Sequence, residues 1–249
     1  GAKSVTQVSK TGALIDTMTL ALGSSPQGTA FYDAEGITYI GGGQFVMTEE
    51  RDRQIVKFTY AAGTTLTRGD TQTVKLGTFV DNIGLEGLSY DPQTGGLILV
   101  KELTPEGIFQ TNVDWALGTA TNGSPTTLNS INLFDPALAN LLDFADVFAL
   151  SNLPSLNGQP DSSNLLVLSQ ASGRIVAIDR AGNIASSLQI VADLGSPLSV
   201  ADQQHEGKRH LRGDEHAARG ACSASGRSGP ALFTKRLAEV HLPQAQDRN

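Results

Sequence analysis

One strand-turn-strand unit recurs along this 249-residue chain, and the repetition constrains its fold more than any other feature. Residues 5–20, VTQVSKTGALIDTMTL, align with residues 175–190, IVAIDRAGNIASSLQI, with apolar residues at matching positions and Gly12 opposite Gly182. Two strands joined by a short polar turn that ends in glycine are typical of a β-hairpin. After a similar distance both copies lead into the dipeptide Glu-Gly. The chain is therefore expected to repeat one hairpin design.

A second repeated unit begins at these acidic dipeptides. Residues 35–58, EGITYIGGGQFVMTEERDRQIVKF, and residues 86–109, EGLSYDPQTGGLILVKELTPEGIF, share an order of elements: Glu-Gly, a short strand, a Gly-rich turn, an apolar strand ending in a carboxylate, and a third strand. A more divergent copy starts with Asp in place of Glu. The four acidic openers, spaced 51, 60 and 60 positions apart, are Glu35, Glu86, Asp146 and Glu206.

The period and the strand content together predict the fold class. Units of about 40–60 residues with about four strands each are typical of β-propeller blades, whereas a solenoid of hairpins would need shorter units and a β-sandwich would not repeat its turn chemistry so regularly. We predict an all-β chain with about four blades or part-blades. It begins inside a blade, because Val5 matches the third strand of later copies. Residues 135–142 start with Asp-Pro and are expected to be a helical excursion between blades.

The repeat fails after Gly207, and the composition changes at the same point. Residues 1–207 carry 21 acidic and 10 basic side chains, whereas residues 208–249 carry 4 acidic and 8 basic ones. We therefore predict an incomplete β-propeller over 1–207 and a basic tail of low order over 208–249. A frameshifted or foreign tail and a genuine disordered basic extension both explain the change. Without its last strands the ring would expose a sheet edge, which predicts poor solubility or oligomerisation.

Three segments carry a resemblance to a known family. Residues 35–58, residues 83–102 (IGLEGLSYDPQTGGLILVKE) and residues 164–184 (NLLVLSQASGRIVAIDRAGNI) combine the Glu-Gly opener, the Gly-containing turn and the strand-end carboxylate. At these motifs the chain resembles the SdiA-regulated family of bacterial β-propellers, which is related in shape to the NHL and phytase-like propellers. The resemblance covers roughly residues 5–207. It implies a six-bladed propeller that is exported, to the periplasm or outside the cell, or anchored to a membrane, with no established activity.

The openers are the candidate ligand-binding residues. The first strand of each blade lines the central channel of a propeller, so Glu35, Glu86, Asp146 and Glu206 are expected to point toward one mouth of that channel. Clustered carboxylates repel one another unless a cation or hydrogen-bond donors compensate, and calcium prefers oxygen ligands. This favours a calcium site at Glu35, Glu86 and Asp146. The alternative is a scaffold role, in which each opener caps the backbone N–H groups of an adjacent turn.

A second set of polar residues lies at strand ends. Glu50 and Glu102, with Gln170 as their counterpart, are interpreted as a solvated, charged blade edge that discourages pairing with other sheets. Arg51 and Arg53 are expected to form surface ion pairs with the acidic residues next to them.

The scarcity of cysteine and histidine excludes several classes of catalytic and metal site. Residues 1–207 contain no cysteine and one histidine, His205, which excludes a cysteine nucleophile and a zinc site built on cysteine or three histidines there. The acidic chain and the nearly aromatic-free tail argue against nucleic-acid binding, and no apolar stretch is long enough for a membrane span. The preferred hypothesis is an exported binding or scaffold module whose partner at the channel mouth, a small molecule or a protein, is unknown. The alternative is a calcium-dependent hydrolase of the phytase or lactonase kind.

Overall fold

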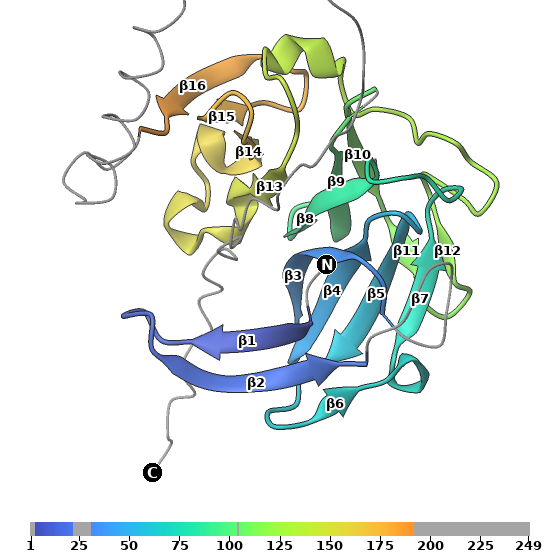
Figure 1. Ribbon diagram of the computed structural model, residues 1–249. Helices are drawn as coiled ribbons and strands as arrows, with labels where there is room; N and C mark the ends of the chain where they lie inside the picture. Colours follow the sequence, from blue (N-terminus) through green and yellow to red (C-terminus); the bar gives the residue numbers. More distant parts are fainter. Residues whose placement is uncertain (1–2, 22–30, 104, 192–249) are drawn as a thin grey trace, which may run out of the picture. The chain divides into compact units, whose positions relative to one another are not determined.

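The computed structural model describes residues 3–21, 31–103 and 105–191, and the fold is given for these residues. Within them the chain forms short β-strands and a few 3-10 helices, arranged in five sheets (Figure 1). No helix in these ranges is long and apolar enough to cross a lipid bilayer. The opener Glu206 and the predicted tail, 208–249, lie outside the described residues.

Three of the sheets are antiparallel meanders that repeat the predicted unit. The first, in the order β3-β4-β5-β7, contains β3 (Ala34–Gly41), β4 (Gln44–Glu49), β5 (Gln54–Thr59) and β7 (Gln72–Lys75). The second, in the order β10-β9-β8, contains β8 (Leu85–Asp91), β9 (Gly96–Lys101) and β10 (Gly107–Thr111). The third, in the order β13-β14-β15-β16, contains β13 (Asp146–Ala149), β14 (Leu165–Ser169), β15 (Arg174–Ile178) and β16 (Ile184–Gln189).

The N-terminal hairpin of β1 (Ser4–Val8) and β2 (Leu14–Leu20) is a part-blade, as predicted. Its register shifts between Gln7 and Val8, and the β15–β16 hairpin shifts between Ala177 and Ile178, which are the aligned positions of the repeat. The same bulge in both hairpins confirms that β1 and β2 match the third and fourth strands of a blade. Strand β2 also pairs in parallel with the two-residue strand β6 (Thr65–Leu66).

The remaining elements are short connections. Strands β11 (Val113–Asp114) and β12 (Thr119–Ala120) form a two-stranded sheet. The predicted helical excursion is a single 3-10 turn, η2 (Pro136–Ala139), capped by Asp135, whose carboxylate accepts a hydrogen bond from the backbone N–H of Ala137. The other 3-10 turns are η1 (Arg68–Asp70), η3 (Leu150–Asn152), η4 (Pro154–Leu156) and η5 (Pro160–Ser163).

The first strands of the three meanders are neighbours, because β8 packs against both β3 and β13. Glycine at the opener permits this approach. A Cβ atom on Gly36 would lie 2.8 Å from the carbonyl oxygen of Glu86, and one on Gly87 would lie 2.6 Å from the Cα atom of Asp146. Each glycine therefore touches the acidic opener of the next sheet. In β3 and β8 the Glu-Gly pair also forms a bulge, which shifts the register between the first and second strands.

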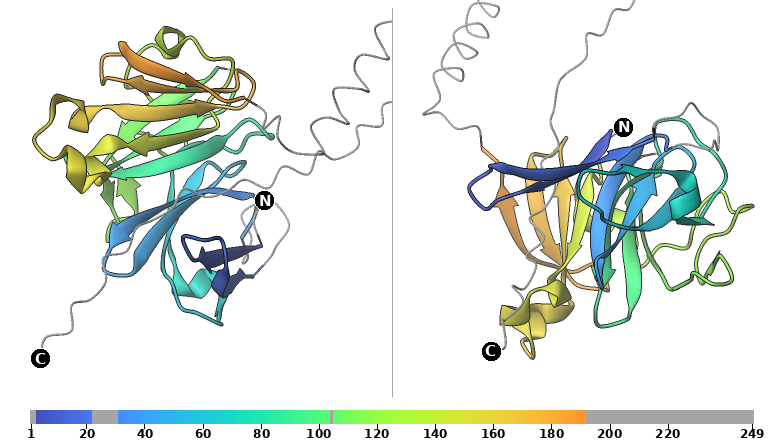
Figure 2. Two further views of the ribbon diagram at one scale, coloured as in Figure 1. Left: turned by 90° about the vertical axis from the view of Figure 1, so that its left-hand side faces the viewer. Right: turned by 90° about the horizontal axis from the view of Figure 1, so that it is seen from below.

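Successive sheets lie face to face (Figure 2). Hydrophobic clusters fill the spaces between them. Successive residues of one strand point to opposite faces of the sheet and join different clusters. On β4, Met47 packs toward β2 and β6, whereas Val46 packs toward β8 and β9. On β9, Leu99 joins that second cluster and Ile98 packs toward β14 and β15. The middle strands therefore read as continuous apolar runs, because both faces of their sheets are buried. Sheets of up to four strands, packed face to face with adjacent first strands, form a β-propeller, which confirms the predicted fold class.

Candidate functional site

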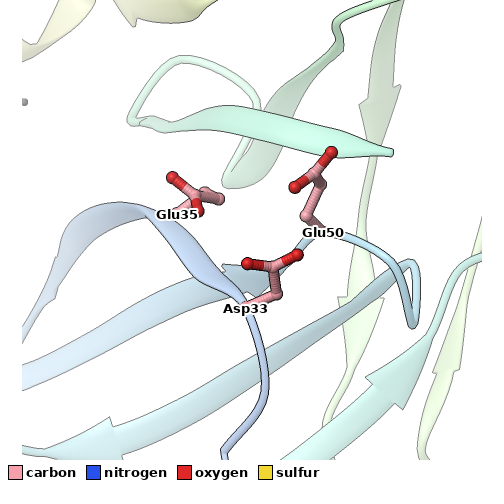
Figure 3. Close-up of side chains that lie close together, drawn as sticks. All are labelled: Asp33, Glu35 and Glu50. Carbon is pink, nitrogen blue, oxygen red and sulfur yellow. The ribbon is translucent and has the colours of Figure 1, made fainter. Parts of the chain in front are cut away.

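A cluster of five carboxylates lies where β3 and β8 begin and where β4 and β9 end. It consists of two overlapping groups that share Glu50, and within each group one oxygen per residue lies within 4.8 Å of the others. Figure 3 shows the first group, Asp33, Glu35 and Glu50, converging from β3 and from the end of β4. The second group is Glu50, Glu86 and Glu102. We call these five residues the carboxylate cluster.

Hairpin geometry explains why residues far apart in sequence meet here. In an antiparallel pair the start of one strand lies beside the end of the next, and Ala34 pairs with Glu49 while Leu85 pairs with Lys101. The openers therefore lie beside the residues that follow β4 and β9, which are Glu50 and Glu102. Packing of β3 against β8 then brings the two hairpin ends together.

Glu50 occupies the centre of the cluster and is 1% exposed. Its carboxylate accepts a hydrogen bond from the backbone N–H of Gly84 at 3.2 Å, and its carbonyl oxygen accepts one from the N–H of Leu85 at 3.3 Å. Only glycine fits at position 84, because a Cβ atom there would lie 2.0 Å from the carbonyl oxygen of Glu50. The loop before β8 is thus closed over Glu50.

The surroundings of Glu50 disfavour its charged form. Burial raises the pKa of Glu50 to about 8, and the negative charge of Glu86, followed by those of Asp33 and Glu35, contributes to the rise. The hydrogen bond from Gly84 opposes it. A buried carboxylate among like charges is stabilised either by a proton or by a cation.

Arg51 offsets the negative charge of the cluster at Asp33. Arg51 donates to the carboxylate of Asp33 at 2.7 Å, to Asn82 Oδ1 at 2.6 Å and to the hydroxyl of Tyr32 at 3.2 Å. Burial alone would raise the pKa of Asp33, but positive groups beside it, Arg51 among them, hold that pKa below its ordinary value. Asp33 is therefore paired with Arg51, whereas Glu50 faces other carboxylates.

The structure brings two of the predicted openers into this site. Glu35 and Glu86 each belong to one of the groups that share Glu50. Asp146 begins β13 as predicted, but it belongs to neither group; its carboxylate accepts a hydrogen bond from the N–H of Val147 at 2.8 Å. Glu206 lies outside the described residues.

The interpretation of the strand-end residues was wrong. Glu50 is buried and Glu102 half-buried, so they do not form a solvated blade edge. Gln170 is exposed. The expected surface pairs of the arginines were wrong too, because Arg51 pairs with Asp33 and Arg53 is fully buried. The signal was present in the repeat, since a carboxylate at the end of the second strand must lie near one at the start of the first.

A family model described as SdiA-regulated matches residues 1–207. Solved structures are similar at low identity. A protein of unknown function from Bacteroides caccae is 10% identical over 77% of this chain and 56% of its own, with a TM-score of 0.40. A periplasmic gluconolactonase from Pseudomonas aeruginosa is 15% identical over 72% and 42%, with a TM-score of 0.39. Virginiamycin B lyase from Staphylococcus aureus is 13% identical over 79% and 50%, with a TM-score of 0.35. The match spans about half the length of these proteins.

Proposed function

The chain belongs to the SdiA-regulated family, and we propose that it is a β-propeller binding module that uses its carboxylate cluster to hold a calcium ion. The ligand, a small molecule or a protein, would bind at the channel mouth beside that ion. One observation supports the proposal above the others: Glu50 is buried between two groups of carboxylates that share it.

The donor set fits a hard cation. All side chains in the cluster offer carboxylate oxygens, which suit calcium, whereas zinc and copper favour the nitrogen and sulfur ligands of histidine and cysteine. Calcium takes six to eight oxygen ligands in flexible geometry, and two overlapping carboxylate groups can supply them from opposite sides of Glu50. A divalent ion would also replace the proton that Glu50 otherwise needs.

We also propose that the protein acts outside the cytoplasm, in the periplasm or the extracellular space. Extracellular calcium modules typically have dissociation constants of about 0.1–1 mM, and such sites are filled where calcium is abundant. Fractionation of a host cell that expresses the natural gene, followed by immunodetection, tests this. Detection in the cytoplasmic fraction alone would contradict it.

Calcium binding is tested by thermal unfolding in calcium and in EDTA. We expect 5 mM calcium to raise the melting temperature of the chain by several degrees, because a ligand that binds only the folded state stabilises it. Glu86→Gln should abolish this shift, since it removes a ligand of the second group.

Asp146→Asn is the matched control, because Asp146 is an opener that belongs to neither group. It should retain the full calcium shift. An equal loss in both variants would show that the openers act as scaffold and not through the cluster. The absence of any shift in the unchanged chain would refute the calcium proposal.

A second candidate function is hydrolysis assisted by calcium. The described residues contain neither histidine nor cysteine, so the proton acceptors that they offer at this site are carboxylates. Glu50 suits that role by position, since it lies at the centre of the cluster beside both carboxylate groups. Assays with p-nitrophenyl phosphate and with a simple lactone, in calcium and in EDTA, test this. Calcium-dependent turnover that disappears in Glu50→Gln would support it, and calcium binding without turnover of either compound would leave the binding module as the function.

A further inference from the structure

A second group of charged residues, all basic, borders the carboxylate cluster: Lys101 directly precedes Glu102, and the backbone N–H of Arg53 donates to the carbonyl oxygen of Glu50 at 3.1 Å. It consists of Arg53 in the turn between β4 and β5, Lys75 at the end of β7, and Lys101 at the end of β9. Arg53 is 0% exposed and Lys101 is 2% exposed. We call these three residues the basic cluster.

The guanidinium group of Arg53 has no hydrogen-bond partner among the described residues. Its Nε, Nη1 and Nη2 atoms are all buried and unpaired, and no carboxylate described lies within ion-pair distance of it. Arginine keeps its charge in proteins, so it cannot escape burial by losing a proton. A buried charge of this kind is stabilised only by a partner that pairs with it.

The surrounding fold holds the guanidinium in place. A Cβ atom on Gly77 would lie 2.6 Å from Cζ of Arg53, so the missing side chain at position 77 makes room for the group. The backbone of Arg53 has a φ of +46°, a conformation that favours glycine or asparagine over arginine. Its carbonyl oxygen accepts a hydrogen bond from the N–H of Leu76 at 2.8 Å. Position 53 thus presents an arginine in a conformation that this residue type seldom adopts.

The neighbouring lysines add positive charge. Lys101 donates to the carbonyl oxygens of Leu103 at 2.5 Å and of Pro105 at 2.7 Å. Burial lowers the pKa of Lys101, and the charge of Arg53 lowers it further. The Nζ atom of Lys75 is also buried without a hydrogen-bond partner among the described residues, although the charges of Asp52 and Glu49 act on it. Among the described residues, acidic side chains thus act on Lys75, whereas none pairs with the guanidinium group of Arg53.

We propose that the basic cluster is a binding site for a small oxyanion, held by the guanidinium group of Arg53 beside Lys101. A planar guanidinium donates two parallel hydrogen bonds to a phosphate or carboxylate group, and such bonds are stronger than those between neutral groups. The anion would be enclosed between the β4–β5 turn and the end of β9. It would join the first and second meanders.

The test is thermal unfolding of the full chain at increasing concentrations of inorganic phosphate. Phosphate replaces chloride so that the ionic strength stays constant. We expect the melting temperature to rise and to saturate, reaching a shift of about 5–10 °C at 100 times the dissociation constant. Arg53→Met should abolish the rise. In phosphate-free buffer it should melt no lower than the unchanged chain, because it removes a buried charge that lacks a partner.

Two further variants keep the test decisive. Gly77→Ala retains the charge but fills the space of the guanidinium, and it should also lose the phosphate response. Lys10→Met, at an exposed position in the β1–β2 turn, should keep it. If Arg53→Met fails to fold, Arg53→Lys takes its place and should weaken the response, since it lacks the planar fork. The proposal would be overturned if phosphate raised the melting temperatures of the unchanged chain and of the Arg53 variant equally, or if chloride stabilised the unchanged chain as much as phosphate does.

Discussion

Replacing Glu50 with glutamine should stabilise the calcium-free protein at alkaline pH and leave it unchanged at acidic pH. The folded chain raises the pKa of Glu50 from 4.5 to about 8, mainly through burial. Below pH 4.5 this residue is protonated in both the folded and the unfolded state. As the pH rises, the unfolded chain loses the proton first, so the free energy of unfolding falls between about pH 4.5 and 8 and then levels off.

The size of the effect follows from the same shift. A change of 3.5 pKa units corresponds to about 5 kcal/mol. Solvent reaches the half-buried neighbours Asp33 and Glu35 and screens their charges, and the hydrogen bond from Gly84 favours the charged form, so we expect a smaller value of about 2 kcal/mol. Glutamine resembles the protonated acid and can still accept the hydrogen bond from Gly84. The free energy of unfolding of the variant should therefore not fall as the pH rises.

The assay is urea unfolding of both proteins in EDTA at several pH values from 4.5 to 8.5. The variant should match the unchanged chain at pH 4.5 and exceed it by about 2 kcal/mol at pH 8.5. Asp161→Asn, which changes an exposed carboxylate, is the control, and its stability should depend on pH in the same way as that of the unchanged chain. A stability difference between the Glu50 variant and the unchanged chain that stays constant across this range would refute the reasoning.

Two further predictions concern the scaffold. Gly36→Ala should lower the free energy of unfolding by about 1–3 kcal/mol, because its Cβ would crowd the carbonyl oxygen of Glu86, whereas Gly69→Ala meets only Thr67 at 3.8 Å and should cost much less in the same urea assay. Arg180→Met should lower the free energy of unfolding by about 2 kcal/mol, because it leaves the buried carboxylate of Asp91 without its ion pair at 3.0 Å. A loss below about 0.5 kcal/mol would show that the hydrogen bonds from Ser151 and Thr94 are enough to stabilise this carboxylate.

Much of the fold could be predicted because the repeat is local. The β1–β2 hairpin, the Gly-rich turn at 41–43 and the acidic starts of β3, β8 and β13 all lie where the pattern indicates. The helical excursion that starts at Asp135 was predicted as well, although it is only one 3-10 turn. Strand periodicity and turn chemistry depend on neighbouring residues, so one sequence suffices to identify them.

The candidate site could be predicted only in part. The openers Glu35 and Glu86 were identified, whereas Glu50 was assigned to solvent because strand-end carboxylates are usually exposed. Its burial depends on Gly84, more than thirty residues away, and on the packing of β3 against β8. Arg53 was misassigned for a similar reason, since Gly77 provides the space that encloses it.

The sequence alone determined the strand order, the turns and the acidic residues that open each unit, because these follow from periodicity within a few dozen residues. Only the tertiary structure decided which charges are buried and which of them meet. Burial depends on the approach of separate sheets, and at Gly36, Gly77, Gly84 and Gly87 that approach depends on the absence of a side chain. A repeat can place a carboxylate at a strand end, but only the packing of the next sheet removes its water.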